Sequence, residues 1–276
     1  MAHYRADIDG LRAVAIIAVV VYHVDRGLLP GGFTGVDVFF VVSGFLITGL
    51  LWGELSAHGR IDWWGFYARR ARRLLPVLAL TALLALGLGV VLMVPDPELR
   101  WLSQSMIATA LFASNVFFWL KTGGYFGALA DSQPLLHTWS LAVEEQFYVV
   151  WPLVMVLLWR GRRGSPHLRR ATGFAAGTLI VGSFVLAATF SDRAAAFYLM
   201  PTRLWELAAG AALALMGPRF ARRVAGMAPA LAVAGTVLLS VSFTIAFPAR
   251  WFPEWARCRP CWAPCRCSWQ GNHRAL

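Results

Sequence analysis

Long apolar runs, joined by short polar or basic connections, constrain this chain more than any other feature. They lie near residues 10–29, 35–53, 74–94, 104–120, 141–159, 172–190, 197–216 and 228–247. A helix of about 20 apolar residues spans the roughly 30 Å hydrocarbon core of a bilayer. The chain is 58% hydrophobic and 14% charged, whereas soluble domains average about 25% charged residues. We therefore predict an all-α, polytopic integral membrane protein.

The basic residues predict its orientation. A net charge of +11 would suggest nucleic-acid binding in a soluble chain, but here the arginines gather between apolar runs, at 60–73, 160–170 and 219–223. Cytoplasmic connections carry such an excess. We expect a multi-pass protein of the cytoplasmic (inner) membrane, with a cytoplasmic N-terminus and no nucleic-acid partner. Asp7 and Asp9 interrupt the basic region that a signal peptide needs, so we expect the first run to stay uncleaved.

The stretch between residues 95 and 160 conflicts with simple alternation across the membrane. Pro95–Glu98 should lie outside and the 160–170 cluster inside, yet two apolar runs separate them. We predict that one run, or the Gly/Pro-bearing segment Thr122–Pro134, is re-entrant, interfacial or broken. Irregular backbone at membrane depth is tolerated where it lines a cavity, so residues 121–145 would form a cavity wall.

The composition changes after Pro248. Residues 249–276 carry all four cysteines among Arg, Pro and Trp, without helical periodicity. Their spacing, C-x2-C-x3-C-x-C, leaves no loop between ligand pairs, unlike structural zinc sites. We favour an irregular, aberrant tail over a metal site, and assign residues 1–248 to one membrane domain.

Arg12 and His23 lie eleven residues apart in the first run, so on a helix they share a face about 16 Å apart. A cation at the centre of a membrane helix costs about 2.5–3.5 kcal/mol, which favours a functional role over a snorkelling arginine and a core histidine. Histidine can act as a general base or accept an acyl group, and the sequence leaves both roles open. Asp37 opens the next run at comparable depth, where it would orient the imidazole or cap a helix.

Two further groups of polar residues stand beside or inside apolar runs. Four arginines, whose forked side chains match phosphate oxygens, precede the third run: Arg69, Arg70, Arg72 and Arg73. A second group enters the fifth run: His137, Trp139, Ser140, Glu144 and Tyr148. Carboxylates entering a membrane span are functional by default, and Glu144 and Tyr148 share a helical face.

The seventh run contains a possible ion pair, because Arg203 and Glu206 are spaced i, i+3. Either a structural pair or a substrate contact fits this spacing. Small residues beyond it, Ala208, Gly210 and Ala212, predict close helix packing. Ser43-Gly44 in the second run predicts the same.

Five segments of the chain resemble motifs of the acyltransferase-3 family of membrane acyltransferases, which O-acetylate bacterial surface glycans such as O-antigen and peptidoglycan. They are DGLRAVAIIAVVVYH (9–23), GVDVFFVVSGFLIT (35–48), FYARRARRLLP (66–76), HTWSLAVEEQFYVVWP (137–152) and PTRLWELAAGAAL (201–213). The resemblance covers about residues 5–248. It implies about ten membrane helices, so we expect a C-terminally truncated member of the family.

The resemblance and the residues together predict a membrane acyltransferase. We expect it to move an acyl group, most simply acetyl, from cytoplasmic acetyl-CoA to a hydroxyl of a cell-surface glycan or lipid-linked saccharide, without a metal. The expected partners are membrane lipid, the glycan acceptor and acyl-CoA. We assign catalysis to His23, Arg12, Asp37 and Glu144, and donor phosphates to Arg69, Arg70, Arg72 and Arg73. We assign substrate binding to His137, Trp139, Ser140, Tyr148, Arg203 and Glu206.

Two alternatives stay open. The intramembrane charges would also suit a transporter or flippase for a lipid-linked glycan, although no internal repeat supports it. An inactive truncated product would keep the coenzyme A site without turnover.

Overall fold

The computed structural model describes residues 5–92, 98–125, 130, 132–161 and 168–245. Every regular element in this part of the chain is a helix, as predicted. The elements are α1 (Ala6–Val24), η1 (Gly32–Thr34), α2 (Gly35–His58), α3 (Trp63–Leu92), α4 (Glu98–Ala110), α5 (Ser114–Thr122), α7 (Thr138–Gly161), α8 (Leu168–Thr189), α9 (Arg193–Tyr198), α10 (Met200–Val224), η2 (Ala225–Met227) and α11 (Ala228–Thr244). The cysteine-bearing tail 249–276 lies outside the described residues.

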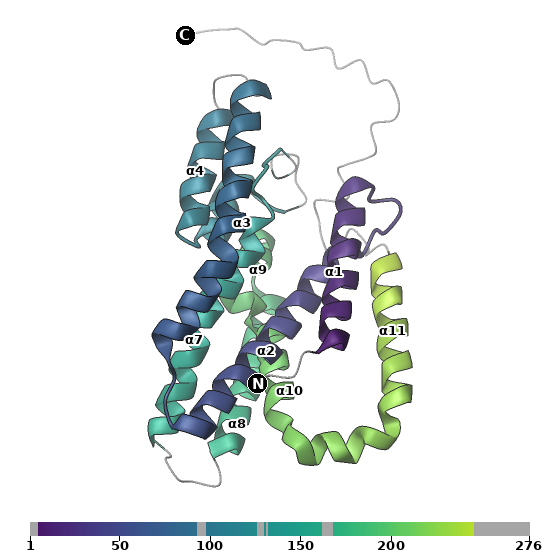
Figure 1. Cartoon of the computed structure of the whole chain (residues 1–276). Helices are drawn as coiled ribbons and strands as arrows, with labels where there is room; N and C mark the ends of the chain where they lie inside the picture. Colours follow the sequence, from purple (N-terminus) through teal and green to yellow (C-terminus); the bar gives the residue numbers. More distant parts are fainter. Residues whose placement is uncertain (1–4, 93–97, 126–129, 131, 162–167, 246–276) are drawn as a thin grey trace, which may run out of the picture.

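The helix α10 is the centre of the bundle, because it packs most extensively against α2 and α8. Figure 1 shows α3 and α4 on one flank and α11 on the other. The first two helices form a hairpin through η1. Buried aromatic side chains fill the interior, among them Trp139, Trp151, Tyr22, Tyr198, Phe40 and Phe147.

The crossing of α2 and α10 depends on two glycines. A Cβ atom at Gly44 would lie 1.9 Å from the carbonyl oxygen of Leu207, and one at Gly210 would lie 1.9 Å from that of Val41. Small residues let membrane helices approach this closely. The close packing predicted at Gly44 and Gly210 is therefore confirmed.

Five helical segments are long and apolar enough to cross a membrane, which confirms the polytopic prediction. They are Gly32–His58, Trp63–Leu92, Thr138–Gly161, Leu168–Thr189 and Phe220–Thr244. The helix α1 falls outside this group because Asp7, Asp9 and Arg12 interrupt its apolar surface. The helix α10 carries Arg203 and Glu206 near its start and lies between other helices.

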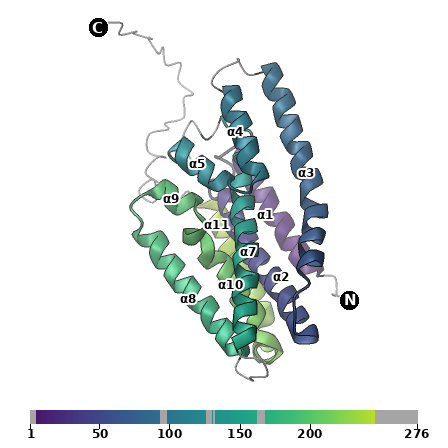
Figure 2. The ribbon, with the colours of Figure 1, turned by 90° about the vertical axis from the view of Figure 1, so that its left-hand side faces the viewer.

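The apolar run near 104–120 is broken, as the topology argument predicted for this region. The helix α4 ends at Ala110, Phe112 has a positive φ of 51°, and α5 begins at Ser114. With 13 and 9 residues, these helices fall short of the roughly 20 that a crossing needs. Figure 2 shows α4 running beside α3 and α5 turning away from it. The helix α7 then continues to the opposite end of the bundle.

The basic connections gather at one end of the molecule. The ends of α2, α7 and α10 and the starts of α3, α8 and α11 all lie in the lower part of Figure 1. These helix ends carry Arg60, Arg160, Arg169, Arg170, Arg222 and Arg223. The arrangement matches the alternation deduced from the arginine clusters.

The third helix begins earlier than the hydrophobic pattern indicated. Asp62 caps it, since the backbone N–H of Gly65 donates to Asp62 Oδ1 at 3.0 Å. A carboxylate at this position satisfies an N–H group that the helix leaves free. The arginines expected to precede the span therefore project from α3 itself, two to three turns after Trp63.

Candidate functional site

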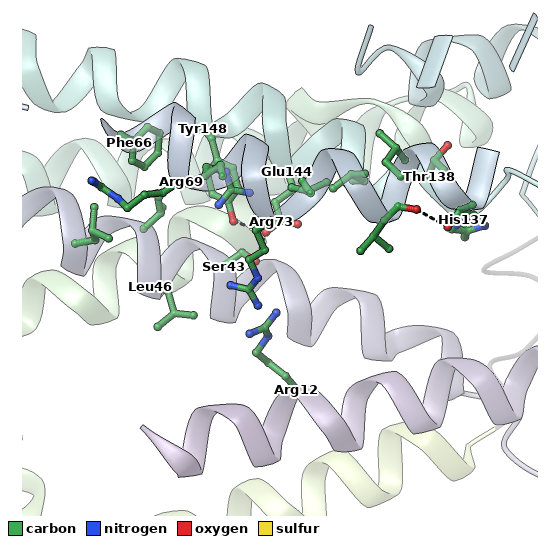
Figure 3. A pocket seen from close by; sticks show the side chains of 18 residues that line it. Arg12, Ser43, Leu46, Phe66, Arg69, Arg73, His137, Thr138, Glu144 and Tyr148 are labelled. Atoms are coloured by element: carbon green, nitrogen blue, oxygen red, sulfur yellow. Dashed lines mark hydrogen bonds between the residues drawn. The ribbon is translucent and has the colours of Figure 1, made fainter. Parts of the chain in front are cut away.

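A cavity of about 640 Å³ lies between α1, α2, α3 and the start of α7. Its volume falls within the range of small-molecule sites, roughly 300–1,000 Å³. The polar side chains that line it are Arg12, Ser43, Arg69, Arg70, Arg73, His137, Thr138, Glu144 and Tyr148, with Thr81 at its edge. Leucine, isoleucine, valine and phenylalanine side chains complete the wall. Sequence-distant motifs thus share one concave site (Figure 3).

Three of the four predicted phosphate-binding arginines line this cavity. Arg69, Arg70 and Arg73 follow the i, i+1, i+4 spacing of one helical face, and all three contribute to the wall. Arg72 is exposed and does not line it. The structure therefore separates Arg72 from the other three members of the motif.

Arg70 is held in place by neighbours on α7. Its Nη2 lies 2.5 Å from Glu145 Oε1, and its guanidinium lies 3.7 Å above the centre of the Tyr148 ring. The buried Nε of Arg70 has no hydrogen-bond partner among the described residues. Glu145 and Tyr148 therefore fix the position of this guanidinium.

The remaining arginines leave positive charge uncompensated. No ion pair within the described residues engages Arg69 or Arg73. Arg12 lies 3.6 Å from Asp9, and its guanidinium faces that of Arg73 across the cavity (Figure 3). Like charges repel at this range, so an anion bound between them would be stabilised.

Glu144 is the carboxylate of the cavity. Ser43 and Tyr148 both donate hydroxyl hydrogen bonds to its Oε1. The predicted shared face of Glu144 and Tyr148 is confirmed. Ser43 was missed, because its place beside Gly44 indicated helix packing alone.

His137 lies at the other end of the cavity from Arg69 (Figure 3). Surrounding protein lowers the pKa of its imidazole, and nearby His23 lowers it further, although a hydrogen bond with the Pro134 backbone opposes the shift. A lowered pKa keeps the ring neutral near pH 7. His137 can therefore accept a proton there.

His23 does not line the cavity, in contrast to Arg12 on the same helix. Its Nδ1 lies 2.8 Å from the carbonyl oxygen of Val19, and its Nε2 lies 3.0 Å from the hydroxyl of Tyr125. A carbonyl only accepts, so Nδ1 donates to Val19, and Nε2 meets the Tyr125 hydroxyl. Sequence reasoning missed Tyr125 as an individual residue, although it lies in the predicted cavity wall 121–145.

Asp37 does not orient His23, so this expectation was wrong. Asp37 Oδ1 lies 3.3 Å from Arg203 Nη1, because α2 turns this carboxylate toward α10 instead of α1. The predicted pair of Arg203 and Glu206 is confirmed, at 2.7 Å.

Four residues assigned to substrate binding lie outside the cavity wall: Trp139, Ser140, Arg203 and Glu206. Trp139 is buried in the aromatic core, where its ring meets Phe40 and Tyr198. The Ser140 hydroxyl donates to the carbonyl oxygen of His137 at 3.2 Å. Within the described residues, Trp139 thus makes packing contacts and Ser140 makes a local hydrogen bond to the backbone.

Comparison with known proteins agrees with the motifs. The acyltransferase-3 family model, described as an acyltransferase domain, matches residues 5–265. The "Putative O-acetyltransferase SAS0844" of Staphylococcus aureus (strain MSSA476) is 36% identical over 221 residues, 79% of this chain and 35% of that protein. The O-acetyltransferase OatA of S. aureus (strain NCTC 8325 / PS 47) is 33% identical over 258 residues, 90% of this chain and 42% of that protein.

The chain thus spans well under half the length of these relatives. No solved structure matches it. Because the family match extends over nearly the whole sequence, the chain belongs to the acyltransferase-3 family.

Proposed function

We propose that this chain transfers an acetyl group from acetyl-CoA, bound in the arginine-lined cavity, to a hydroxyl of a cell-surface glycan or lipid-linked saccharide. The observation that carries this proposal is the make-up of the cavity: arginines at one end, His137 at the other, and Glu144 between them. Family membership supplies the reaction type. The names of the relatives supply O-acetylation.

The donor's phosphates suit the arginine end of the cavity. Coenzyme A carries a pyrophosphate and a 3′-phosphate, and guanidinium groups bind phosphate oxygens in pairs. Arg69 and Arg73 have no ion-pair partner in the described chain, and Arg70 keeps a free buried Nε. Arg12 faces Arg73 across the same space. These unpaired donors support a multiply charged anion as the ligand.

The basic helix ends support cytoplasmic entry of the donor. They gather at the end of the bundle where α3 begins, and cytoplasmic ends of membrane proteins carry excess arginine. The acyl group would then extend along the cavity toward His137. We assign this protein to the cytoplasmic membrane, with the N-terminus on the cytoplasmic side.

The end of the cavity at His137 suits proton transfer from the hydroxyl of the acceptor. A neutral imidazole near pH 7 can take the hydroxyl proton as the alcohol oxygen attacks the thioester carbonyl. The carbonyl–sulfur bond then breaks and the thiolate leaves. The charge of His23 disfavours a proton on His137. Arg12 would stabilise the oxyanion or a donor phosphate.

Binding of acetyl-CoA to the purified protein tests the donor site. Losing one charge-assisted contact costs about 1.5–3 kcal/mol, so we expect Arg73→Ala to weaken binding by about 10- to 100-fold. Arg72→Ala is the matched control, since Arg72 is exposed on the same helix outside the cavity. Equal effects of the two substitutions would contradict the proposed donor site.

A second assay separates the two roles of His23. Membranes containing the protein are incubated with radiolabelled acetyl-CoA and a glycan acceptor, and label is followed on both. Label that reaches the protein in wild type but not in His23→Ala indicates an acyl carrier. Label that reaches only the glycan, and requires His23, indicates a base. Undiminished transfer in His23→Ala would refute both roles.

A further inference from the structure

Two carboxylates share one guanidinium in the interior of the bundle. Arg203 Nη1 lies 3.3 Å from Asp37 Oδ1 and 2.7 Å from Glu206 Oε1. The Glu206 side chain is 0% exposed, that of Arg203 is 14% exposed, and that of Asp37, at the edge of the cluster, is 34% exposed. This cluster joins α2 to α10 beside the glycine crossing and does not belong to the cavity.

The second carboxylate oxygen of Glu206 lacks a hydrogen-bond donor in the part of the chain that the structure describes. Glu206 Oε2 is buried and has no hydrogen-bond donor among the described residues, although the Asp37 carboxyl lies within hydrogen-bonding reach. Two ionised carboxylates can only accept, so they would face each other without a donor. A proton on either one converts the contact into a hydrogen bond.

The net charge of Arg203, Asp37 and Glu206 also favours a proton on one of the two carboxylates. Arg203 is the only cation that pairs with either carboxylate within the described residues. With both acids ionised, the cluster would carry a net negative charge. An uncompensated charge is costly at the fully buried Glu206, and two carboxylates held at one guanidinium nitrogen disfavour each other's ionised form. The other titratable group facing Arg203 is Tyr125, a phenol that adds no compensating positive charge.

The cluster also connects to the partner of His23. The Arg203 guanidinium lies over the rings of Phe197 and Trp139, at 4.9 and 5.6 Å from their centres. Its Nε donates to the carbonyl oxygen of Phe197 at 3.1 Å. The Phe197 ring stacks on Tyr125 with centres 4.5 Å apart. Tyr125 in turn contacts His23 Nε2 through its hydroxyl.

We propose that Asp37 and Glu206 share a single proton, and that this neutral cluster holds Arg203 and the stacked rings as the support for the Tyr125–His23 contact. Glu206 is then a positioning residue, since it acts through Arg203 and Phe197. The link to His23 rests on the proposed acyltransferase function, whereas the shared proton does not.

Infrared spectroscopy of the purified protein tests the shared proton directly. A protonated carboxyl gives a C=O stretching band that shifts in D2O. We expect this band in the wild type and its loss in both Glu206→Gln and Asp37→Asn, because the carboxylate that remains pairs with Arg203 in its ionised form. The exposed Glu98→Gln is the control and should leave the band unchanged. A band that persists in both cluster variants overturns the proposal.

The melting and folded yield of the single and double amide variants, Asp37→Asn and Glu206→Gln, provide the second measurement. Each single amide variant should fold and melt near the wild type, because one carboxylate still pairs with Arg203. The double variant leaves Arg203 unpaired and should lose most of its folded yield. If either single variant lost as much folded yield as the double variant, the proposal of a shared proton would be overturned.

Acyl transfer then tests the positioning role. We expect Glu206→Gln to keep turnover within about threefold of wild type, and Glu206→Ala to lose more than about tenfold through kcat. Equal turnover in these two variants would overturn the positioning role. The infrared and melting results stand independently of turnover, so failure of the proposed function would be recognised separately.

Discussion

The arginines on the cavity wall of α3 and the arginine at the seam between α2 and α10 differ in whether a carboxylate neutralises them. At the seam the helices meet at Gly44 and Gly210, and Arg203 has two carboxylate partners. At the cavity wall the helices stand apart, and Arg69 and Arg73 have no ion pair among the described residues. Charge that is neutralised holds the fold together, whereas charge left without a partner indicates a ligand.

The physical reason lies in the cost of desolvation. A cation in a closely packed interior is stable only with a partner of good geometry. A cation beside a water-filled cavity keeps its solvation until an anion replaces the water. The same residue type therefore has a structural role at Arg203 and is available for binding at Arg73.

Substitution at the glycine crossing should have the largest effect. The new Cβ of Gly44→Ala would meet the Leu207 carbonyl oxygen at 1.9 Å, and overpacking of this kind costs about 3 kcal/mol. Gly49→Ala on the same helix meets nothing within 4 Å and should gain a few tenths to about 1 kcal/mol from helix propensity. Melting of both variants in detergent measures the difference. Similar melting temperatures would show that the seam is not closely packed.

Substitutions around Glu144 test the cavity side and should have intermediate effects. We expect Glu144→Gln to lower turnover by about 100-fold, the lower limit typical of general acid–base groups. Tyr148→Phe removes one hydrogen bond to the Glu144 side chain and should lower turnover by about tenfold. Folding should be retained, in contrast to the seam variants. Full turnover in Glu144→Gln would exclude this carboxylate from the reaction.

Helical periodicity predicted the parts of the site that lie along one helix. It placed Glu144 and Tyr148 on one face. The density of arginines singled out Arg69, Arg70 and Arg73, but also Arg72, which lies outside the cavity. A charge argument indicated an irregularity between residues 95 and 160, where the structure has the broken run. These features depend on spacing within a helix or on the count of membrane crossings. Both are present in the sequence itself.

The contacts between helices could not be predicted in the same way. Asp37 pairs with Arg203 and His23 with Tyr125, because each helix is rotated about its axis by packing along its whole length. Ser43 faces Glu144 for the same reason. Hydrophobic spans give weak information on this rotation, since lipid-facing and core-facing surfaces are both apolar.

The smallest effect is expected at Asp192, which caps the start of α9. Asp192 Oδ1 accepts from the Ala195 N–H at 3.0 Å and Oδ2 accepts from the Trp119 indole N–H at 2.9 Å. These bonds hold the pKa of Asp192 below its usual value. The folded state then binds the proton less readily than the unfolded state, so the stabilisation is complete above about pH 4 and is lost as the pH falls through the lower, folded value.

Asp192→Ala should therefore lower stability by about 1 kcal/mol at pH 7, with a smaller difference in strong acid. Melting temperatures of both proteins from pH 7 to pH 3 provide the measurement, and Asp192→Asn, which keeps a cap oxygen without the charge, is the control. A difference that does not change with pH would show that side-chain volume, not the carboxylate, stabilises this cap. Because Asp192 is exposed whereas Arg203 is largely buried, a small loss of stability here beside the large loss expected for the Asp37→Asn, Glu206→Gln double variant would confirm that burial decides how much a charge contributes.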